Sequence, residues 1–453
     1  MLVSVLNSGN VIHLEQVNLS WVDSFKSKTA KVISFIGEGG QGYVYKVECD
    51  GKLYALKWYK KETYLNKTDK VAFRKNLSKN IEDGPPKVNG SPASQFLWPL
   101  ALARETDGTF GYVMELFPDS YISFSDYYWG KAYHPTWKSL VDVALCLVES
   151  FMILHRNGKS YQDLNHGAFR TSPHVAGVDR KVLICDNDNV APDRVNLGIR
   201  GFPGFMAPEV ELGEALPSTL TDLHSLAVVL FGLFFRGHPL EGQDTTKRAA
   251  LMTASIRRDI YGLYPMFCYH PTNDRNRPDP IVHSEGVMHY WPIFPKEFRN
   301  YFTKAFTVGL RDPNKRVLEV EWLKALIDLR SSIVYTGPIK PGKTPPEQFV
   351  ELSGNQMPSG SCRLKFEDGR IVAISNGVSL YACHTSGDIS DFRTVTGWVA
   401  YQEDTKRLVM VNNTETVWHY SVSGQSQSVA PKKMLPIVSG MTISFAGIKA
   451  TVY

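Results

Sequence analysis

The order of apolar and polar positions divides the chain into three parts. Over residues 1–118, short apolar runs alternate with turn residues, which is typical of β-strands. The predicted strands are 32–36, 43–45, 53–56 and 112–114. The dipeptide Asp50-Gly51 separates the second from the third and indicates a β-hairpin. One segment, 70–82, predicts a helix that ends before Gly84-Pro85-Pro86.

From about residue 137 to 335 the apolar residues recur every three to four positions, which predicts helices. One such face carries Val141, Leu145, Val148, Met152 and Ile153. The segment 223–235 is apolar nearly all round and predicts a buried helix. Two further helices are predicted at 295–308 and 318–329.

The last part begins after a stretch rich in Pro and Gly. Residues 336–347 predict a stiff, extended linker because Pro and Gly dominate them. Strand signals return beyond it, as at 371–374 and 408–411, with turn residues between them. We therefore expect a small all-β sandwich over 348–453 and an α+β fold for the chain as a whole.

Composition narrows the class of protein. Of the 453 residues, 43% are hydrophobic and 21% charged, which excludes wholesale disorder. The formal net charge is only +5 and its charges are interspersed, so no nucleic acid partner is expected. The six cysteines include no CxxC pair, which favours reduced thiols in the cytoplasm. No signal peptide is evident, and the most apolar stretch, 226–235, is about half as long as a membrane span, so no membrane contact is expected.

A glycine-rich segment lies between the first two predicted strands. Residues 37–44 read Gly-Glu-Gly-Gly-Gln-Gly-Tyr-Val, a GxGxxGxV pattern in a strand-turn-strand setting. In that setting, backbone amides of a hairpin cover phosphates, whereas a dinucleotide fold uses the end of a helix. Lys57 closes the apolar strand that follows, where its ammonium could pair with α- and β-phosphates. The alternative is an ordinary Gly-rich hairpin followed by a lysine that reaches solvent.

Two aspartates follow at the ends of apolar segments. Asp163 lies in the sequence Tyr-Gln-Asp-Leu-Asn after a predicted helix. Asp186 comes 23 residues later and ends the apolar run Val182-Leu-Ile-Cys185. Such a pair suits phosphoryl transfer, because one carboxylate can orient the attacking hydroxyl while the other holds Mg²⁺. Either aspartate alone would be read as a solvated loop residue.

These motifs, followed in order by Ala207-Pro208-Glu209, Asp222 and Arg316, resemble the eukaryotic-like protein kinases over about residues 30–335. Asn187-Asp188, with Leu183-Ile184-Cys185 before them, look most like bacterial kinases encoded beside von Willebrand A-type and phosphatase proteins. The resemblance implies a bilobal fold with a β-rich N-lobe (1–118, including an N-terminal extension) and an α-helical C-lobe (119–335). It also implies that Glu209 and Arg316 form an ion pair and that Asp222 braces the catalytic loop.

The resemblance carries over to the site residues. Asp163 and Lys57 are the implied catalytic residues, and Asp186 with Asp188 the implied ligands of Mg²⁺ or Mn²⁺. The residues implied to bind ATP are Gly37, Glu38, Gly39, Gly40, Gln41, Gly42, Val44, Ala55, Lys57, Met114, Glu115 and Phe117, the last three in the hinge that reads adenine.

Several positions depart from the kinase pattern. Gln162 replaces the arginine that normally precedes the catalytic aspartate, and residues 186–209 contain no Ser, Thr or Tyr, which excludes phosphorylation of a hydroxyl there. Ala168 replaces the metal-binding asparagine, and Asp188 stands where the family has glycine and could supply the missing ligand. The predicted helix 70–82 has Glu82 as its only glutamate, at its very end, so its usual salt bridge to Lys57 is in doubt.

Two other changed positions, Asn165 and Phe202, are the usual markers of acceptor preference. We nevertheless expect an ATP-dependent kinase that phosphorylates Ser or Thr of a protein partner in a bacterial signalling or stress system. A phosphatase or a von Willebrand A-type protein encoded nearby is a further expected partner. The alternative is a nucleotide-binding pseudokinase scaffold. A small-molecule phosphotransferase is disfavoured, since such enzymes generally lack the Ala-Pro-Glu anchor.

The C-terminal β-module weakly resembles a forkhead-associated domain, through 408–411, Asn412-Asn413, Trp418 and 440–445. Such domains read phosphothreonine with an arginine, a serine and loop asparagines, so a phosphopeptide is an expected ligand of this module. The arginine has no clear place in this sequence, and a generic β-sandwich for protein contact is the alternative.

Overall fold

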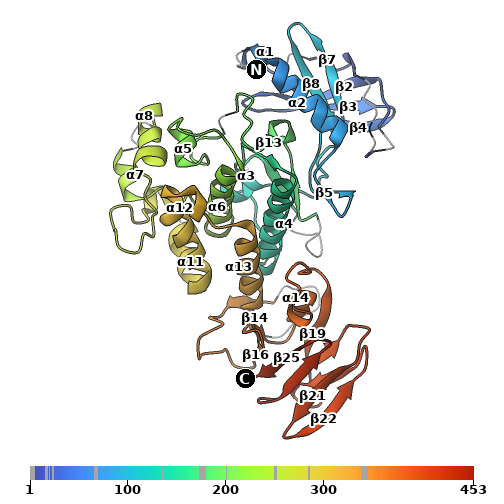
Figure 1. The fold of residues 1–453 in the computed structure, drawn as a ribbon, viewed down its shortest axis with the longest axis vertical. Coiled ribbons are helices and arrows are strands. Elements are labelled where there is room, and N and C mark those ends of the chain that lie inside the picture. Colours follow the sequence, from blue (N-terminus) through green and yellow to red (C-terminus); the bar gives the residue numbers. More distant parts are fainter. Residues whose placement is uncertain are drawn as a thin grey trace.

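The computed structural model describes residues 6–15, 19, 21–22, 25–65, 70–134, 136–172, 180–199, 201–248, 252–283, 286–337 and 345–453. Helices and strands are mixed, which confirms the α+β prediction (Figure 1). None of the helices in these ranges has both the length and the apolar character needed to cross a membrane.

The N-terminal part is a six-stranded antiparallel sheet in the order β1-β2-β3-β4-β8-β7. Its strands are β1 (Val11–His13), β2 (Thr29–Glu38), β3 (Gly42–Cys49), β4 (Lys52–Tyr59), β7 (Ala101–Thr106) and β8 (Thr109–Met114). The same part contains α1 (Lys61–Leu65), α2 (Lys70–Asp83) and the short pair β5 (Lys87–Val88) and β6 (Ser91–Pro92). All four strands and the helix predicted here are confirmed, whereas β1 and β7 were not predicted.

The predicted hairpin turn is present between β3 and β4. Asp50 and Gly51 have φ values of 50° and 78°, the two left-handed positions of a type I′ turn. This turn sets the register in which Val44 lies opposite Lys57.

The middle part is mainly helical. Its helices are α3 (Phe124–Tyr128), α4 (Trp137–Arg156), α5 (Pro208–Glu211), α6 (Thr219–Phe235), α7 (Gln243–Arg248), α8 (Ala254–Arg257), α9 (Pro280–His283), α10 (Gly286–Tyr290), α11 (Lys296–Ala305), α12 (Val308–Arg311) and α13 (Glu319–Ser331). Short strands connect them: β9 (Ile122–Ser123), β10 (Lys159–Ser160), β11 (Phe169–Thr171), β12 (Val182–Ile184) and β13 (Ala191–Pro192). Every residue of α6 from Thr221 to Phe235 is buried, as the apolar pattern predicts.

The C-terminal part is a β-sandwich of a six-stranded and a four-stranded sheet, ordered β17-β16-β25-β24-β21-β22 and β18-β19-β20-β23. The strands are β16 (Cys362–Phe366), β17 (Ile371–Ile374), β18 (Ser379–Tyr381), β19 (Val395–Gln402), β20 (Arg407–Asn412), β21 (Trp418–Val422), β22 (Gln425–Val429), β23 (Met434–Pro436), β24 (Thr442–Phe445) and β25 (Ile448–Val452). Leu364, Met410 and Trp418 lie in the core between the sheets. One short helix, α14 (Ala382–Thr385), departs from the all-β prediction.

The segment predicted to be an extended linker instead doubles back where it is described. β14 (Ile333–Tyr335) pairs with β15 (Glu347–Phe349), and the amide of Thr336 donates to the carbonyl of Pro346 over 2.9 Å. Both ends of the Pro-rich stretch therefore lie side by side, while residues 338–344 are outside the described ranges. Pro and Gly prevent regular structure, but they do not prevent the flanking residues from pairing.

Charged contacts dock the sandwich on α4 and α13 (Figure 1). The buried guanidinium of Arg330 binds Asp142 on α4 over 3.2 Å, donates to the carbonyl of Phe392 over 2.7 Å and lies 3.7 Å from the ring centroid of Tyr381. Because Arg330 is on α13 and Phe392 belongs to the sandwich, one buried charge joins both regions.

A second contact at this boundary is bidentate. Nη1 of Arg393 donates to Oε1 of Glu149 over 2.8 Å, and Nη2 donates to Oε2 of the same carboxylate. Both side chains are less than one third exposed, so water screens this pair only partly. The sandwich is therefore held firmly against the helical part.

Reversing one charge of this pair tests the docking. We expect Arg393→Glu to lower the free energy of unfolding by ~2 kcal/mol, because two partly buried carboxylates would then face each other. The double variant Glu149→Arg with Arg393→Glu should recover most of the loss in urea unfolding. Arg407→Glu, at an exposed position of β20, is the control and should change stability by less than ~0.5 kcal/mol. A double variant no more stable than Arg393→Glu alone would contradict the pairing.

Candidate functional site

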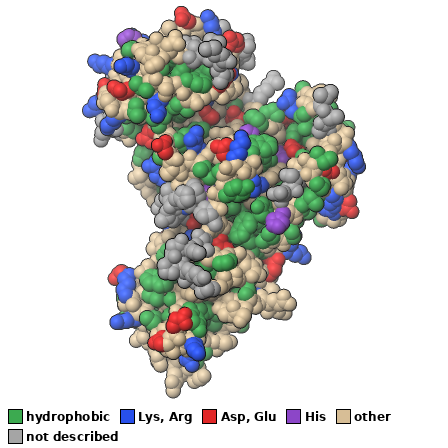
Figure 2. All heavy atoms as spheres, turned by 180° about the vertical axis from the view of Figure 1, so that it is seen from behind, with side chains coloured by type: hydrophobic (Ala, Val, Ile, Leu, Met, Phe, Trp, Pro, Cys, Tyr) green, Lys and Arg blue, Asp and Glu red, His purple; other side chains and the backbone are tan. Residues whose placement is uncertain are grey.

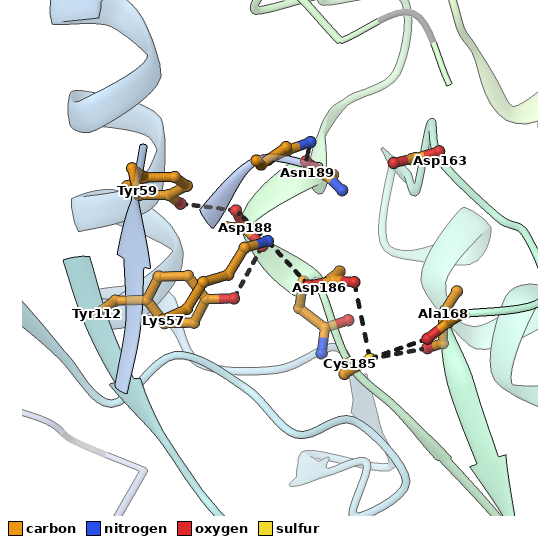
Figure 3. Close-up of polar contacts among 12 residues, drawn as sticks. Lys57, Tyr59, Tyr112, Asp163, Ala168, Cys185, Asp186, Asp188 and Asn189 are labelled. Atoms are coloured by element: carbon orange, nitrogen blue, oxygen red, sulfur yellow. Dashed lines mark hydrogen bonds and ion pairs between the residues drawn. The ribbon is translucent and has the colours of Figure 1, made fainter. Parts of the chain in front are cut away.

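Four of the predicted site residues, Lys57, Asp163, Asp186 and Asp188, lie where the N-terminal sheet meets the helical part (Figure 3). β3 and β4 contribute from the sheet, and the segments 161–165 and 185–190 contribute from the helical part. The Gly-rich turn lies between β2 and β3, and within it the amide of Gly39 donates to the carbonyl of Gly42 over 2.8 Å. A Cβ on Gly42 would lie 2.5 Å from the carbonyl oxygen of Trp58, so only glycine allows β3 and β4 to approach here.

Lys57 is the buried centre of the site. Its Nζ donates to Oδ1 of Asp186 over 2.8 Å and to Oδ1 and Oδ2 of Asp188 over 3.0 and 3.1 Å. Burial alone would lower the pKa of this ammonium, but the two carboxylates outweigh it, so the pKa is raised. Lys57 is therefore fully charged and joins β4 to the segment that contains both aspartates.

Asp188 has a different place from the one predicted. Its side chain is fully buried and, besides Lys57, accepts from the hydroxyl of Tyr59 over 2.6 Å and of Tyr112 over 2.8 Å. Burial alone would raise the pKa of this carboxyl, but Lys57 and the tyrosine hydroxyls lower it below the ordinary value. The prediction that Asp188 is a metal ligand does not fit this geometry, because both oxygens are already used inside the protein.

Asp186 is the carboxylate that faces outward. Its side chain is 40% exposed, and its Oδ1 accepts from Lys57. Ala168 lies close by, where its carbonyl accepts from the amide of Cys185 over 2.9 Å, but its methyl group offers no ligand (Figure 3). Within the described ranges, no three His, Cys, Asp or Glu side chains form a metal cluster. A single exposed carboxylate still suits Mg²⁺, which is usually held by one or two carboxylates together with phosphates and water.

Asp163 lies on the neighbouring loop, apart from the Lys57 cluster (Figure 3). Burial and the nearby carboxylate of Asp186 raise the pKa of Asp163 to about 7, although the Asn165 amide, 3.1 Å from its Oδ1, acts in the opposite direction. A half-buried carboxyl with a pKa near neutrality is suited to exchange a proton.

The loop that carries Asp163 is braced from below by Asp222. The amides of Tyr161 and Gln162 donate to its two oxygens over 2.5 and 2.9 Å, which confirms the predicted bracing. The predicted ion pair between Glu209 and Arg316 is also confirmed, at 2.7 Å. Asp222 is buried and the carboxylate of Glu209 is half-buried, and both accept from donors far away in the sequence.

Uncharged side chains tie the 185–199 segment to this loop. The Tyr161 hydroxyl donates to the carbonyl of Cys185 over 2.5 Å, and Nε2 of Gln162 donates to the carbonyl of Val195 over 2.6 Å. Gln162 therefore holds the segment directly, at the position where the kinase pattern has an arginine for a phosphate.

Helix α2 meets the same segment through amides. Nδ2 of Asn76 and Nδ2 of Asn80 both donate to the carbonyl of Val190, over 2.9 and 2.8 Å. Glu82 is exposed at the end of the helix. The carboxylates that contact Lys57 thus come from 186–188 rather than from α2.

The residues predicted to hold adenine are partly brought together. Ala55 and Met114 are buried in one cluster with partly buried Val44, whereas Glu115 is exposed. Phe117 lies farther along, with the guanidinium of Arg170 4.5 Å from its ring centroid.

The remaining predicted residues lie around the Gly-rich turn. Glu38 pairs with Lys60 over 2.5 Å, and Nε2 of Gln41 donates to Asn189 over 3.2 Å. Gly37 and Gly40 have open space where a side chain would stand. Gln41 thus links the turn to the 186–189 segment beneath it.

Sequence reasoning missed Tyr59 and Tyr112. The signal was present, because Tyr59 is two residues beyond Lys57 on β4 and so points to the same side of the sheet. Tyr112 is paired directly with Lys57 across β4 and β8. That pairing requires the sheet order, which the pattern of the sequence alone does not supply.

Comparison with known proteins finds a distant kinase relative. The chain is 25% identical over 318 residues to the protein kinase YegI of Escherichia coli (strain K12) and 26% identical to the protein of the same name from Escherichia coli O157:H7. Each match covers 66% of this chain and 44% of the relative, so the chain spans less than half of these longer proteins. No protein-family model matches the chain.

The brace beneath the site makes stability depend on pH. His155 contacts Asp222 over 3.2 Å and also Glu319; burial alone would lower the pKa of its imidazole, but both carboxylates raise it to about 9. Its contribution is complete below the unfolded-state pKa of about 6.5 and is lost as pH rises through about 9.

We expect the free energy of unfolding to fall by ~3 kcal/mol between pH 6 and pH 10 because of this group. Urea unfolding across that range measures the slope. In His155→Gln the slope should be much smaller, since the titrating group is removed, and an equal slope in that variant would rule out the assignment.

Proposed function

We propose that the chain is an ATP-dependent protein kinase that transfers the γ-phosphate to Ser or Thr hydroxyls of a protein partner. The observation that carries the proposal is the ion pair between Lys57 and Asp186, under a Gly-rich turn and beside the loop of Asp163. The distant relationship to proteins named kinases supports a phosphotransferase of this general kind.

In this proposal the chain has a kinase-like bilobal fold, with residues 1–118 as the β-rich lobe and 119–335 as the helical lobe. The backbone amides of 37–42 cover the phosphates of ATP, and Lys57 pairs with the α- and β-phosphates. Val44, Ala55 and Met114 form the apolar surface for adenine, together with the hinge at 115–117.

Asp186 is the residue that would hold Mg²⁺ or Mn²⁺, since its carboxylate is partly exposed beside Lys57. The bound cation supplies neutralisation of the charge on the phosphates. Asp163, with a pKa of about 7, orients the acceptor hydroxyl and accepts its proton.

A second candidate is the nucleotide-binding scaffold without transfer. Ala168 favours it, because the oxygen ligand that kinases have there is missing and Asp188 is committed to Lys57. The two candidates share the same binding residues and differ only in whether one cation-binding carboxylate is sufficient.

The C-terminal sandwich is proposed to be forkhead-associated-like and to act by contact with protein. Nδ2 of Asn412 donates to the carbonyl of Thr416 and Nδ2 of Asn413 to that of Val395, so these amides are used inside the sandwich. Arg393 is engaged by Glu149 of α4. We therefore favour docking on the helical part over phosphopeptide binding.

A phosphatase or a von Willebrand A-type protein encoded nearby is the proposed cytoplasmic partner.

Transfer of label from γ-labelled ATP tests the kinase proposal. We expect wild-type protein with Mg²⁺ or Mn²⁺ to label itself or a generic acceptor, and Asp163→Asn to reduce the rate by ~10²-fold or more while still binding ATP. Asp107→Asn, in an exposed turn where φ is 52°, is the matched control and should label like wild type.

Binding of ATP by a wild-type protein that transfers no label would favour the scaffold. A wild-type protein that neither binds nor transfers would contradict both candidates. Equal labelling by wild type and Asp163→Asn would remove Asp163 from the mechanism.

A further inference from the structure

The environment of Lys57 raises a question that the kinase resemblance leaves open. In that pattern a helix glutamate holds the lysine, but α2 presents no carboxylate to it in this chain. The buried residues of α2 are Phe73, Leu77, Asn80 and Ile81, and the ring of Phe73 packs against Tyr59 with centroids 5.5 Å apart. Helix α2 therefore supports the site through apolar and amide contacts.

Asp188 has every property needed to replace that glutamate. Its side chain is fully buried, whereas that of Asp186 is 40% exposed. Its two oxygens receive three donor groups: the ammonium of Lys57 and the hydroxyls of Tyr59 and Tyr112. The tyrosines project from β4 and β8, so they fix the carboxylate against the same sheet that carries Lys57.

We propose that Asp188, oriented by Tyr59 and Tyr112, is the residue that positions Lys57 for the phosphates of a nucleotide, in place of a glutamate on α2. This inference rests on the proposed function, because it assigns a task to the binding site described there. Asp188 acts through Lys57 and is therefore a positioning residue.

The arrangement explains why the site has two carboxylates on one lysine. A cation held by Asp186 would compete with Lys57 for the charge of that carboxylate, and a buried ammonium without a partner is costly. Asp188 keeps Lys57 paired in that state. Lys57, both carboxylates and both tyrosines belong to β4, β8 and the 186–189 segment, so no side chain of α2 is a partner in this pairing, although Phe73 of α2 packs against Tyr59.

Direct binding measurements separate this role from a merely structural one. Under the proposed function Lys57 contacts phosphates but not the nucleoside, so we expect Asp188→Asn to weaken ATP binding about tenfold or more and to leave adenosine binding unchanged. Lys57→Met should also lose affinity for ATP but not for adenosine. The double variant Lys57→Met with Asp188→Asn should bind ATP no more weakly than Lys57→Met alone. Glu82→Gln is the matched control for a helix partner and should bind ATP like wild type.

A second variant keeps the test decisive if Asp188→Asn folds poorly. Tyr59→Phe with Tyr112→Phe retains both charges and removes only the hydroxyls that orient Asp188, so it should also weaken ATP relative to adenosine. Wild-type affinity for ATP in Asp188→Asn, or in the tyrosine double variant when Asp188→Asn does not fold, would overturn this inference alone. A selective loss in Glu82→Gln would do the same. Wild-type protein that binds no ATP would overturn the proposed function, and this inference with it.

Discussion

The buried positive charge of Lys57 is the constraint on which the rest of the site depends. An ammonium inside a protein must be paired, and here the partners come from a segment 129 and 131 residues away in sequence. The need to neutralise Lys57 therefore holds the N-terminal sheet against the helical part. The buried carboxylate of Asp188 must in turn be satisfied, because a buried acceptor without a hydrogen bond is costly. The hydroxyls of Tyr59 and Tyr112 donate to it and so fill the acceptor sites that Lys57 leaves open.

The same principle is repeated below the site. Asp222 is buried and accepts from two backbone amides and contacts His155, while Glu209 accepts from the guanidinium of Arg316. Each of these carboxylates is matched to donors from a distant part of the chain. The loops that carry Asp163 and Asp186 have little regular structure of their own, so these buried polar contacts fix their positions.

The sequence predicts local elements well, but it does not predict which distant residues come into contact. Alternation and helical periodicity predict β4, α2 and α6 because one face of each packs on a core. The resemblance to kinases likewise implies that Asp222 braces a loop and that Arg316 pairs with Glu209. By contrast, Asp188 follows Asp186 by two residues, and nothing in that spacing tells which carboxylate turns outward. The Pro-rich segment 336–347 is a second example. Its composition predicts a stiff chain, but it does not predict that β14 and β15 on either side pair with each other.

Two features that could move in a kinase are replaced here by direct contacts. Under the proposed function, Asp188 takes the place of the ion pair to α2, and the amide of Gln162 on Val195 takes the place of a phosphate that anchors residues 186–209. Neither replacement depends on a modification, because the segment has no hydroxyl to modify. Under the proposed function the site is therefore assembled by folding itself. Control of such a site has to act on something other than its assembly. One example is access to the Gly-rich turn, and another is the contacts of α4. This helix binds the sandwich through Glu149 and contacts Asp222 through His155.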